Sequence, residues 1–224
     1  MSGLGRALER HGLLIRGVLN VTLDAPHQDI QQVVLVGNAG RSMWSAFSSW
    51  WSDNALVEHP LDTWSRQVLS PIADAFHATA VFPFEGPPYL PFQQWAKAGA
   101  PVSDSPLKVL LHRDYGPWHA YRGALLFTRP IAEAEPDSVD TSLCVSCLEQ
   151  PCLSACPVDA FDGEQFLMHT CASELKRQVA TGIEPCVAEG CLARRACPVG
   201  QAYQYDAAQM RFHQEAFMRS RGSA

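Results

Sequence analysis

The sequence has no cysteine before residue 144, no long apolar run and few charged side chains. Charged residues make up 18% of the 224 residues and hydrophobic ones 47%, which indicates a folded globular chain and excludes a disordered one. No stretch of 18 or more apolar residues occurs, so we expect no transmembrane helix. Residues 1–17 lack the apolar region of a signal peptide.

The balance of charge excludes another class of partner. The chain has 17 Lys and Arg against 23 Asp and Glu, a net charge of −6. Binding of nucleic acid depends on clustered basic side chains that neutralise phosphates, so we expect no nucleic-acid partner. With no long apolar run in the chain, we expect no membrane partner either. Together with the missing signal peptide, this predicts a cytoplasmic protein, in a compartment that keeps thiols reduced.

All eight cysteines of the chain lie in one segment. Their spacing is Cys144-x2-Cys147-x4-Cys152-x3-Cys156-Pro157, then Cys171, then Cys186-x4-Cys191-x5-Cys197-Pro198. The first run is close to the pattern C-x2-C-x2-C-x3-C-P of bacterial ferredoxins that hold two clusters. Eight thiolates are the number that two [4Fe–4S] clusters require.

Disulfides and zinc are the alternatives for these cysteines. A reducing compartment and the confinement to one segment argue against disulfides. Two all-cysteine zinc sites would also use eight thiolates, but zinc ribbons favour paired C-x2-C knuckles, and only Cys144 and Cys147 form one. The repeated Ala-Cys-Pro-Val at 155–158 and 196–199 is typical of iron–sulfur proteins. The sequence therefore predicts two [4Fe–4S] clusters.

In the two-cluster pattern, the fourth cysteine of each run binds the other cluster. Applied here, this rule gives two groups of ligands. The first cysteine set is Cys144, Cys147, Cys152 and Cys197, and the second cysteine set is Cys156, Cys171, Cys186 and Cys191.

A linker divides the chain. Residues 130–140 hold two prolines and four acids with little apolar content. We therefore expect an N-terminal domain over 1–135 and an iron–sulfur domain over 136–224.

The N-terminal domain alternates strand and helix patterns. Apolar runs predict strands over 32–37, 80–82 and 121–127, and apolar residues at helical spacing predict helices over 43–51 and 61–76. Ser105-Pro106 resembles a helix start. This order predicts an α+β class with a three-layer α/β/α domain and a mixed sheet. The Gly37-x-x-Gly40 turn permits a phosphate site or only a tight turn, and the tryptophans of 43–51 face a cofactor or the core.

Two segments resemble known families. Residues 111–126, with His112, Tyr115-Gly116, Trp118 and Arg122-Gly123, resemble the His-x-x-aromatic-Gly-x-Trp-x-x-x-Arg-Gly stretch of the cobalamin-processing CblC family. The resemblance implies a nitroreductase-like (flavin-reductase-related) fold that binds vitamin B12 with its lower base displaced and removes its upper ligand.

The cysteine region resembles the C-terminal ferredoxin module of epoxyqueuosine reductase, including the detached Cys171 and a Phe-His-x2-Ala-Phe stretch at 212–217. That enzyme, like the reductive dehalogenases, couples a nitroreductase-like cobalamin domain to two [4Fe–4S] clusters. The two resemblances cover roughly 106–126 and 142–217.

The chain departs from both families. Phe82 precedes Pro83 where CblC proteins have histidine, and residues 116–121 differ from the Gly-Trp-Ile-Gly-Lys-Asn of epoxyqueuosine reductases. An Asp-Ser-Ala-Pro segment supplies the acid of that enzyme, and Asp104-Ser105-Pro106 is a loose counterpart. Asp104 is thus a candidate catalytic acid, with a helix N-cap as the alternative.

A corrinoid ring needs apolar and aromatic surface and hydrogen bonds to its carboxamide fringe. The candidate residues for these contacts are Tyr115, Gly116, Trp118, His119, Tyr121 and Arg122. Arg122 offers five donors to amides or phosphate, and an ordinary salt bridge is its alternative. We expect cobalamin to bind base-off, without a histidine on cobalt.

The sequence therefore predicts a corrinoid-binding iron–sulfur oxidoreductase that reduces cobalamin or removes its upper ligand. The electrons would come from an external ferredoxin or flavodoxin, or from a reductase. Three alternatives remain: a cobalamin-dependent reductase of another substrate, a ferredoxin carrier with a docking domain, and an FMN protein. A homodimer is compatible with the resemblance.

Overall fold

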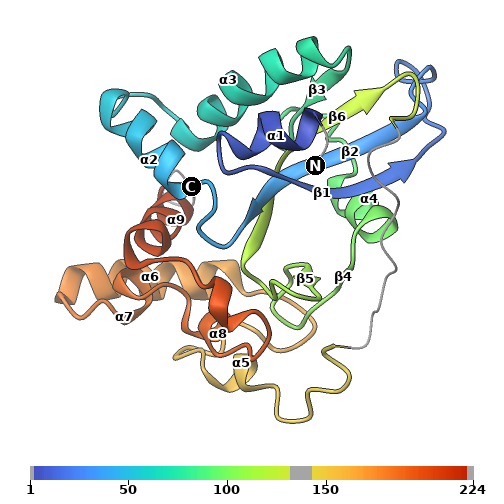
Figure 1. Ribbon diagram of the computed structural model, residues 1–224. Helices are drawn as coiled ribbons and strands as arrows, with labels where there is room; N and C mark the ends of the chain where they lie inside the picture. The colour runs from blue at the N-terminus through green and yellow to red at the C-terminus, as the bar shows by residue number, and fades with distance from the viewer. Residues whose placement is uncertain (1–2, 132–142, 221–224) are drawn as a thin grey trace. The chain divides into compact units, whose positions relative to one another are not determined.

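The computed structural model describes residues 3–131 and 143–220, which form two compact units (Figure 1). The first unit combines the described residues up to Val102 with those from His119 to Ile131, and the second combines 103–118 with those from Leu143 onward. The predicted domain boundary after residue 135 and most of the predicted linker lie outside the described residues. The assignment of 103–118 to the second unit was not predicted.

A four-stranded sheet organises the first unit. Its order is β1-β2-β6-β3, with β1 at Leu14–Asn20, β2 at Gln32–Ala39, β3 at Thr79–Val81 and β6 at His119–Phe127. Every residue of β2 is buried, as its unbroken apolar run predicts for a central strand. All three ladders of this sheet are antiparallel, so the predicted mixed sheet is wrong. The chain returns in the opposite direction at β6, which lies between β2 and β3.

Helices cover both faces of this sheet (Figure 1). They are α1 (Gly3–Glu9), α2 (Trp44–Asp53), α3 (Pro60–Ala75) and α4 (Phe92–Gly99). A side chain at Gly123 would meet Leu69 of α3, and one at Gly17 would meet the backbone of Gly99 in α4. Gly17 pairs with Leu35, which pairs with Ala124, so Gly123 points to the opposite face. The first unit thus has the predicted α/β/α layers.

Helices are the main regular elements of the second unit. Its elements are β5 (Leu111–His112), α5 (Pro151–Ser154), α6 (Met168–Thr181), α7 (Pro185–Ala188), α8 (Leu192–Arg195), the 3-10 turn η1 (Gln201–Tyr203) and α9 (Ala207–Ser220). The two-residue strand β4 (Val102–Ser103) lies at the division between the units. Leu175, Cys186 and Val187 form one buried cluster, and Trp118, Tyr205 and Met210 form another.

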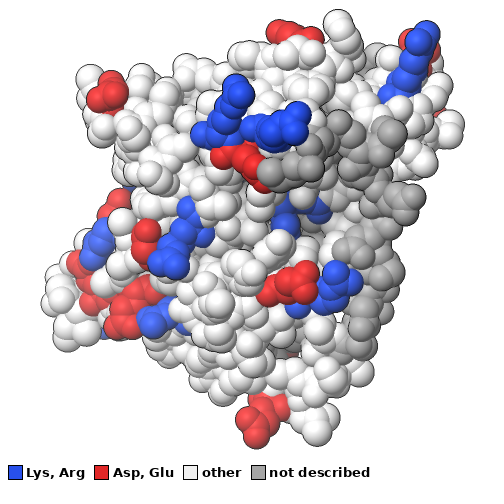
Figure 2. Space-filling model, viewed as in Figure 1, with Lys and Arg blue, Asp and Glu red and all other residues white. Residues whose placement is uncertain are grey.

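The strongly patterned elements were predicted correctly, and the helix at Ser105 was not. The Ser105 hydroxyl donates to the Val109 carbonyl at 2.6 Å, and Lys108 has a positive φ of 55°, so the chain turns here. None of the helices in the described part of the chain is both long and apolar enough to span a membrane. On the face in Figure 2, basic and acidic side chains are interspersed, with no extended basic patch among the described residues.

Candidate functional site

Four cysteines of the second unit line one small cavity. They come from four places in the chain: Cys156 follows α5, Cys171 lies in α6, Cys186 lies in α7, and Cys191 precedes α8. They are the four members of the second cysteine set. The backbone N–H of Ala160 donates to Cys156 Sγ at 3.2 Å. Their role as ligands stays a prediction.

Hydrogen bonds fix the backbone around this cavity. The Cys186 N–H donates to Oε1 of Gln178 at 2.9 Å, and the Cys186 carbonyl accepts from Nε2 of Gln214 at 3.0 Å. Burial raises the pKa of the Cys171 thiol to about 12, and the other three thiols of the set add to the rise. Four thiolates in this space would repel one another, so a cationic group is the natural partner of their ionised forms.

The first cysteine set is also brought together. The pKa of the Cys144 thiol is raised to about 11, chiefly by burial, and the other three thiols of the set add to the rise. Cys152 is buried in α5 beside Leu107 and Ala193, and the Cys197 carbonyl accepts a hydrogen bond from Gln201. Among all the residues that the structure describes, no group of three or more His, Cys, Asp or Glu side chains is close enough to hold a metal ion.

The candidate residues Tyr115, Gly116 and Trp118 lie in the second unit and pack against its own chain. Gly116 has a φ of 55°, and a Cβ there would stand 2.1 Å from the Val199 carbonyl oxygen. The Tyr115 ring meets that of Tyr203 edge-on at 4.7 Å. Trp118 is 1% exposed. The close backbone approach that Gly116 permits is therefore to another loop of the second unit.

Trp118 has an arginine on its ring. The Arg194 guanidinium carbon lies 4.7 Å from the centre of the Trp118 ring and 4.8 Å from that of Tyr205. Arg194 Nε also donates to the Pro117 carbonyl at 2.9 Å. The sequence analysis did not single out Arg194. Its position three residues after one predicted ligand and three before another was the available signal.

The other candidates, His119, Tyr121 and Arg122, lie on β6 in the first unit. Tyr121 pairs with Gly37 and Gly123 with Val36, so Arg122 is the extra residue of a β-bulge. The charge of Arg122 acts on Asp62 of α3. Burial raises the pKa of Asp62, and the charge of Arg122 opposes the rise.

A second bulge lies across β2 from this one. Ile15 pairs with Val36 and Gly17 with Leu35, which leaves Arg16 as the extra residue of β1. Arg16 is only 5% exposed. The sequence analysis missed it, although a lone arginine inside the apolar strand Leu14–Asn20 was a visible signal.

Tyr121 lies within the electrostatic reach of Arg16. Burial raises the pKa of Tyr121 to about 12, against the opposing charge of Arg16. Its hydroxyl is buried and has no hydrogen-bond partner among the described residues. The His119 ring meets the Tyr121 ring edge-on at 5.7 Å. Buried polar groups in proteins are normally hydrogen-bonded, so this hydroxyl is suited to bind a polar group of a ligand.

The remaining candidate acid, Asp104, is exposed in the second unit.

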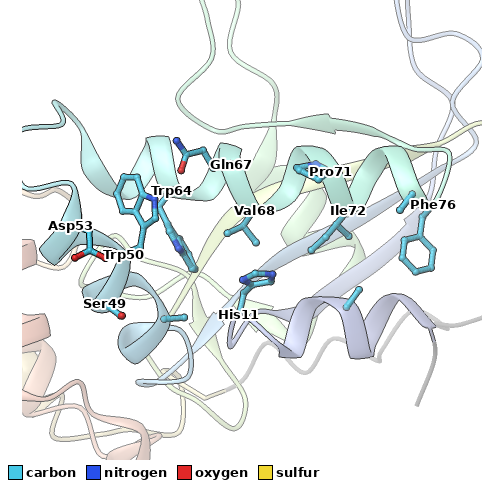
Figure 3. Close-up of a pocket in the computed structure, with 13 residues that line it drawn as sticks. His11, Ser49, Trp50, Asp53, Trp64, Gln67, Val68, Pro71, Ile72 and Phe76 are labelled. Atoms are coloured by element: carbon cyan, nitrogen blue, oxygen red, sulfur yellow. The ribbon is translucent and has the colours of Figure 1, made fainter.

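A separate groove of about 630 Å³ lies between α1, α2 and α3 of the first unit (Figure 3). Trp50, Trp64 and Ile72 line it together with His11 and Asp53, whereas Phe47 is buried. The tryptophan-bearing helix thus contributes both to the core and to a groove.

The described structure defines a mixed α+β fold with a helix-covered antiparallel sheet. No protein-family model matches the chain, and no curated protein matches it. Among the solved structures that match is CblC of C. elegans, described as a B12-trafficking protein and a homologue of human MMACHC. The TM-score is 0.52 at 12% identity, over 96% of this chain and 94% of that chain. The chain therefore has a CblC-like fold.

Proposed function

We propose that this chain is an iron–sulfur oxidoreductase that binds cobalamin base-off and removes its upper ligand or reduces it. The observation that carries the proposal is the occurrence of two gathered sets of four cysteines in a chain with the fold of a B12-trafficking protein. The fold supports cobalamin as substrate. Clusters bound by the cysteines would deliver the electrons.

The chemistry of the cysteine sets fits [4Fe–4S] clusters. Thiolates are the ligands of these clusters, and an N–H···S bond such as that from Ala160 to Cys156 is one of the protein's means of tuning them. Around a single zinc ion four sulfurs lie at about 2.3 Å from one centre. In a four-iron cluster each sulfur binds a different iron, so the sulfurs stand farther apart. Bound in the two sets, the clusters would supply one-electron transfer at low potential.

In the first unit, the groups around the two bulges are suited to the polar edge of a corrinoid. The Tyr121 hydroxyl would donate to a side-chain amide, and Arg16, Arg122 and His119 would contact amide or phosphate oxygens. These side chains sit on strands, which hold a ligand more rigidly than loops do. The donor of electrons, the cytoplasmic location and a homodimer stay predictions.

A paired titration tests the proposal. Anaerobically reconstituted protein is first assayed for iron and sulfide, then titrated with hydroxocobalamin and, separately, with FMN. We expect two clusters per chain and a change of the cobalamin spectrum to its base-off form. Binding of FMN without cobalamin would favour the flavin alternative, and binding of neither would leave an electron carrier.

A further inference from the structure

Arg194 lies between the second cysteine set and an aromatic cluster of the same unit. It belongs to α8, which begins directly after Cys191. A cavity of about 40 Å³ is lined by both residues, together with Trp118, Tyr205 and His213. Cys191 also lines the cavity that holds the other three cysteines of the set. Cys191 is therefore the member of the second set that lines a cavity together with Arg194.

The guanidinium of Arg194 has little freedom to move away from this cavity. It packs on Trp118 and Tyr205, whose rings meet at 71° with centroids 5.4 Å apart. Both Nε and Nη2 of Arg194 donate to the Pro117 carbonyl. A planar group held by two rings and a forked hydrogen bond keeps its position better than a lysine would.

The charge of Arg194 is permanent and acts in a partly dry environment. Arginine side chains carry a fixed positive charge in proteins. Cys191 is half-buried and shares a cavity with Arg194. Burial raises the pKa of its thiol, and the Arg194 backbone N–H and then the Arg194 charge oppose that rise. A positive charge stabilises a group that becomes more negative on reduction, and more strongly where water is scarce.

A carboxylate also acts on the second set. Glu174 acts on Cys171 and Cys186 with the opposite sign, but Arg177 binds it through two hydrogen bonds of 2.7 Å and 2.6 Å. Burial is the main influence on the pKa values of Cys144, Cys152 and Cys197 of the first set. Neighbouring thiols come next at Cys144 and Cys152, and a backbone hydrogen bond from Val199 comes next at Cys197; no charged side chain of a described residue is among the causes. The two sets thus differ in their electrostatic surroundings.

We infer that Arg194 is a positioning residue that holds Trp118 beside the second cysteine set and selectively raises the reduction potential of the cluster bound there. This inference rests on the proposed function, because it requires a cluster at that set. It concerns the order of electron flow: the cluster with the higher potential receives the electron from the other.

The test is a redox titration followed by electron paramagnetic resonance on the full-length, reconstituted protein. Arg194→Gln should shift one of the two cluster potentials to a more negative value and leave the other unchanged. Arg194→Lys retains the charge and should restore most of the potential. Arg195→Gln is the matched control, because the neighbouring Arg195 pairs with Glu189 and should not influence either cluster. A Cys144→Ser background, which keeps only the second set complete, assigns the shifted signal.

The outcomes separate this inference from the proposed function. If wild-type protein takes up no iron, the cluster assignment fails and the inference fails with it. If wild-type protein holds two clusters but Arg194→Gln moves neither potential, or both equally, the inference alone is overturned. Equal shifts in Arg194→Gln and Arg194→Lys would also overturn it, because the charge would then not be the cause.

Discussion

Gly116 approaches Val199 so closely that a Cβ on Gly116 would lie 2.1 Å from the Val199 carbonyl oxygen. The approach is mutual, because a Cβ on Gly200 would lie 2.2 Å from the Tyr115 carbonyl oxygen. Both glycines have positive φ, at 55° and 72°. The loop before β6 is therefore docked on the loop that follows the last cysteine.

Gly116→Ala should destabilise the second unit. The substitution forces the Val199 backbone to move and places alanine in the left-handed region, so we expect a loss of roughly 2–4 kcal/mol in the free energy of unfolding. Gly182→Ala is the control: its φ is 70°, but a Cβ there meets nothing within 4 Å. The control should cost about 1 kcal/mol. Equal losses in chemical denaturation would contradict the close approach.

Cys171→Ser and Cys152→Ser should each remove one cluster. Each serine variant is expected to hold about half of the wild-type iron and sulfide, because each set loses one of its four thiolates. The double variant should hold almost none. Chemical iron and sulfide analysis gives the result. Complete loss from Cys171→Ser alone, or no loss, would contradict the assignment of the two sets.

Tyr121→Phe should separate stability from binding. Because the buried hydroxyl has no hydrogen-bond partner among the described residues, its removal should leave the free energy of unfolding within about 1 kcal/mol of wild type or raise it. Loss of its hydrogen bond to the corrinoid should weaken cobalamin binding about tenfold, equivalent to about 1.4 kcal/mol. Tyr89→Phe, at an exposed tyrosine, should change neither. Unchanged binding in Tyr121→Phe would remove Tyr121 from the site.

Asp62→Asn should change how stability depends on pH. The pKa of Asp62 is raised in the folded state, chiefly by burial, so the fold favours the protonated carboxyl. The contribution of Asp62 is present below its unfolded pKa and is lost as the pH rises through the higher folded pKa. The asparagine variant should therefore gain stability relative to wild type as the pH rises above 4. Denaturation at a series of pH values measures the difference, and a constant or falling difference would contradict the direction of the shift.

The sequence predicted those parts of the fold that local patterns determine. The apolar run of β2 and the apolar stripe of α3 were identified within a few residues. The strand β1 was missed because Arg16 interrupts its apolar pattern, and burial of that arginine depends on a bulge that only the pairing with β2 creates. The pairing of β6 with β2 made the sheet antiparallel, and no local pattern encodes a partner.

The candidate site was predicted unevenly for the same reason. The spacing of the cysteines matches a known two-cluster pattern, so the two sets could be predicted from the sequence. The residues from Tyr115 to Arg122 were expected to form one site, but they belong to two units. Trp118 lies in the core of the second unit, and Tyr121 lies in the sheet of the first. Gly116 was expected to admit a ligand, and its close neighbour is Val199, 83 residues away in the chain.

The central claim is that the cysteine sets deliver electrons to a bound cobalamin, and release of the upper ligand tests it most directly. Cyanocobalamin is mixed anaerobically with the reconstituted protein and a low-potential reductant, and release of cyanide is followed over a single turnover. The same reaction is run with the Cys152→Ser/Cys171→Ser variant, which lacks a complete set. We predict release with the wild-type protein at a rate well above that with the variant. Equal rates with both, or no release with a wild-type protein that holds both clusters, would contradict the account.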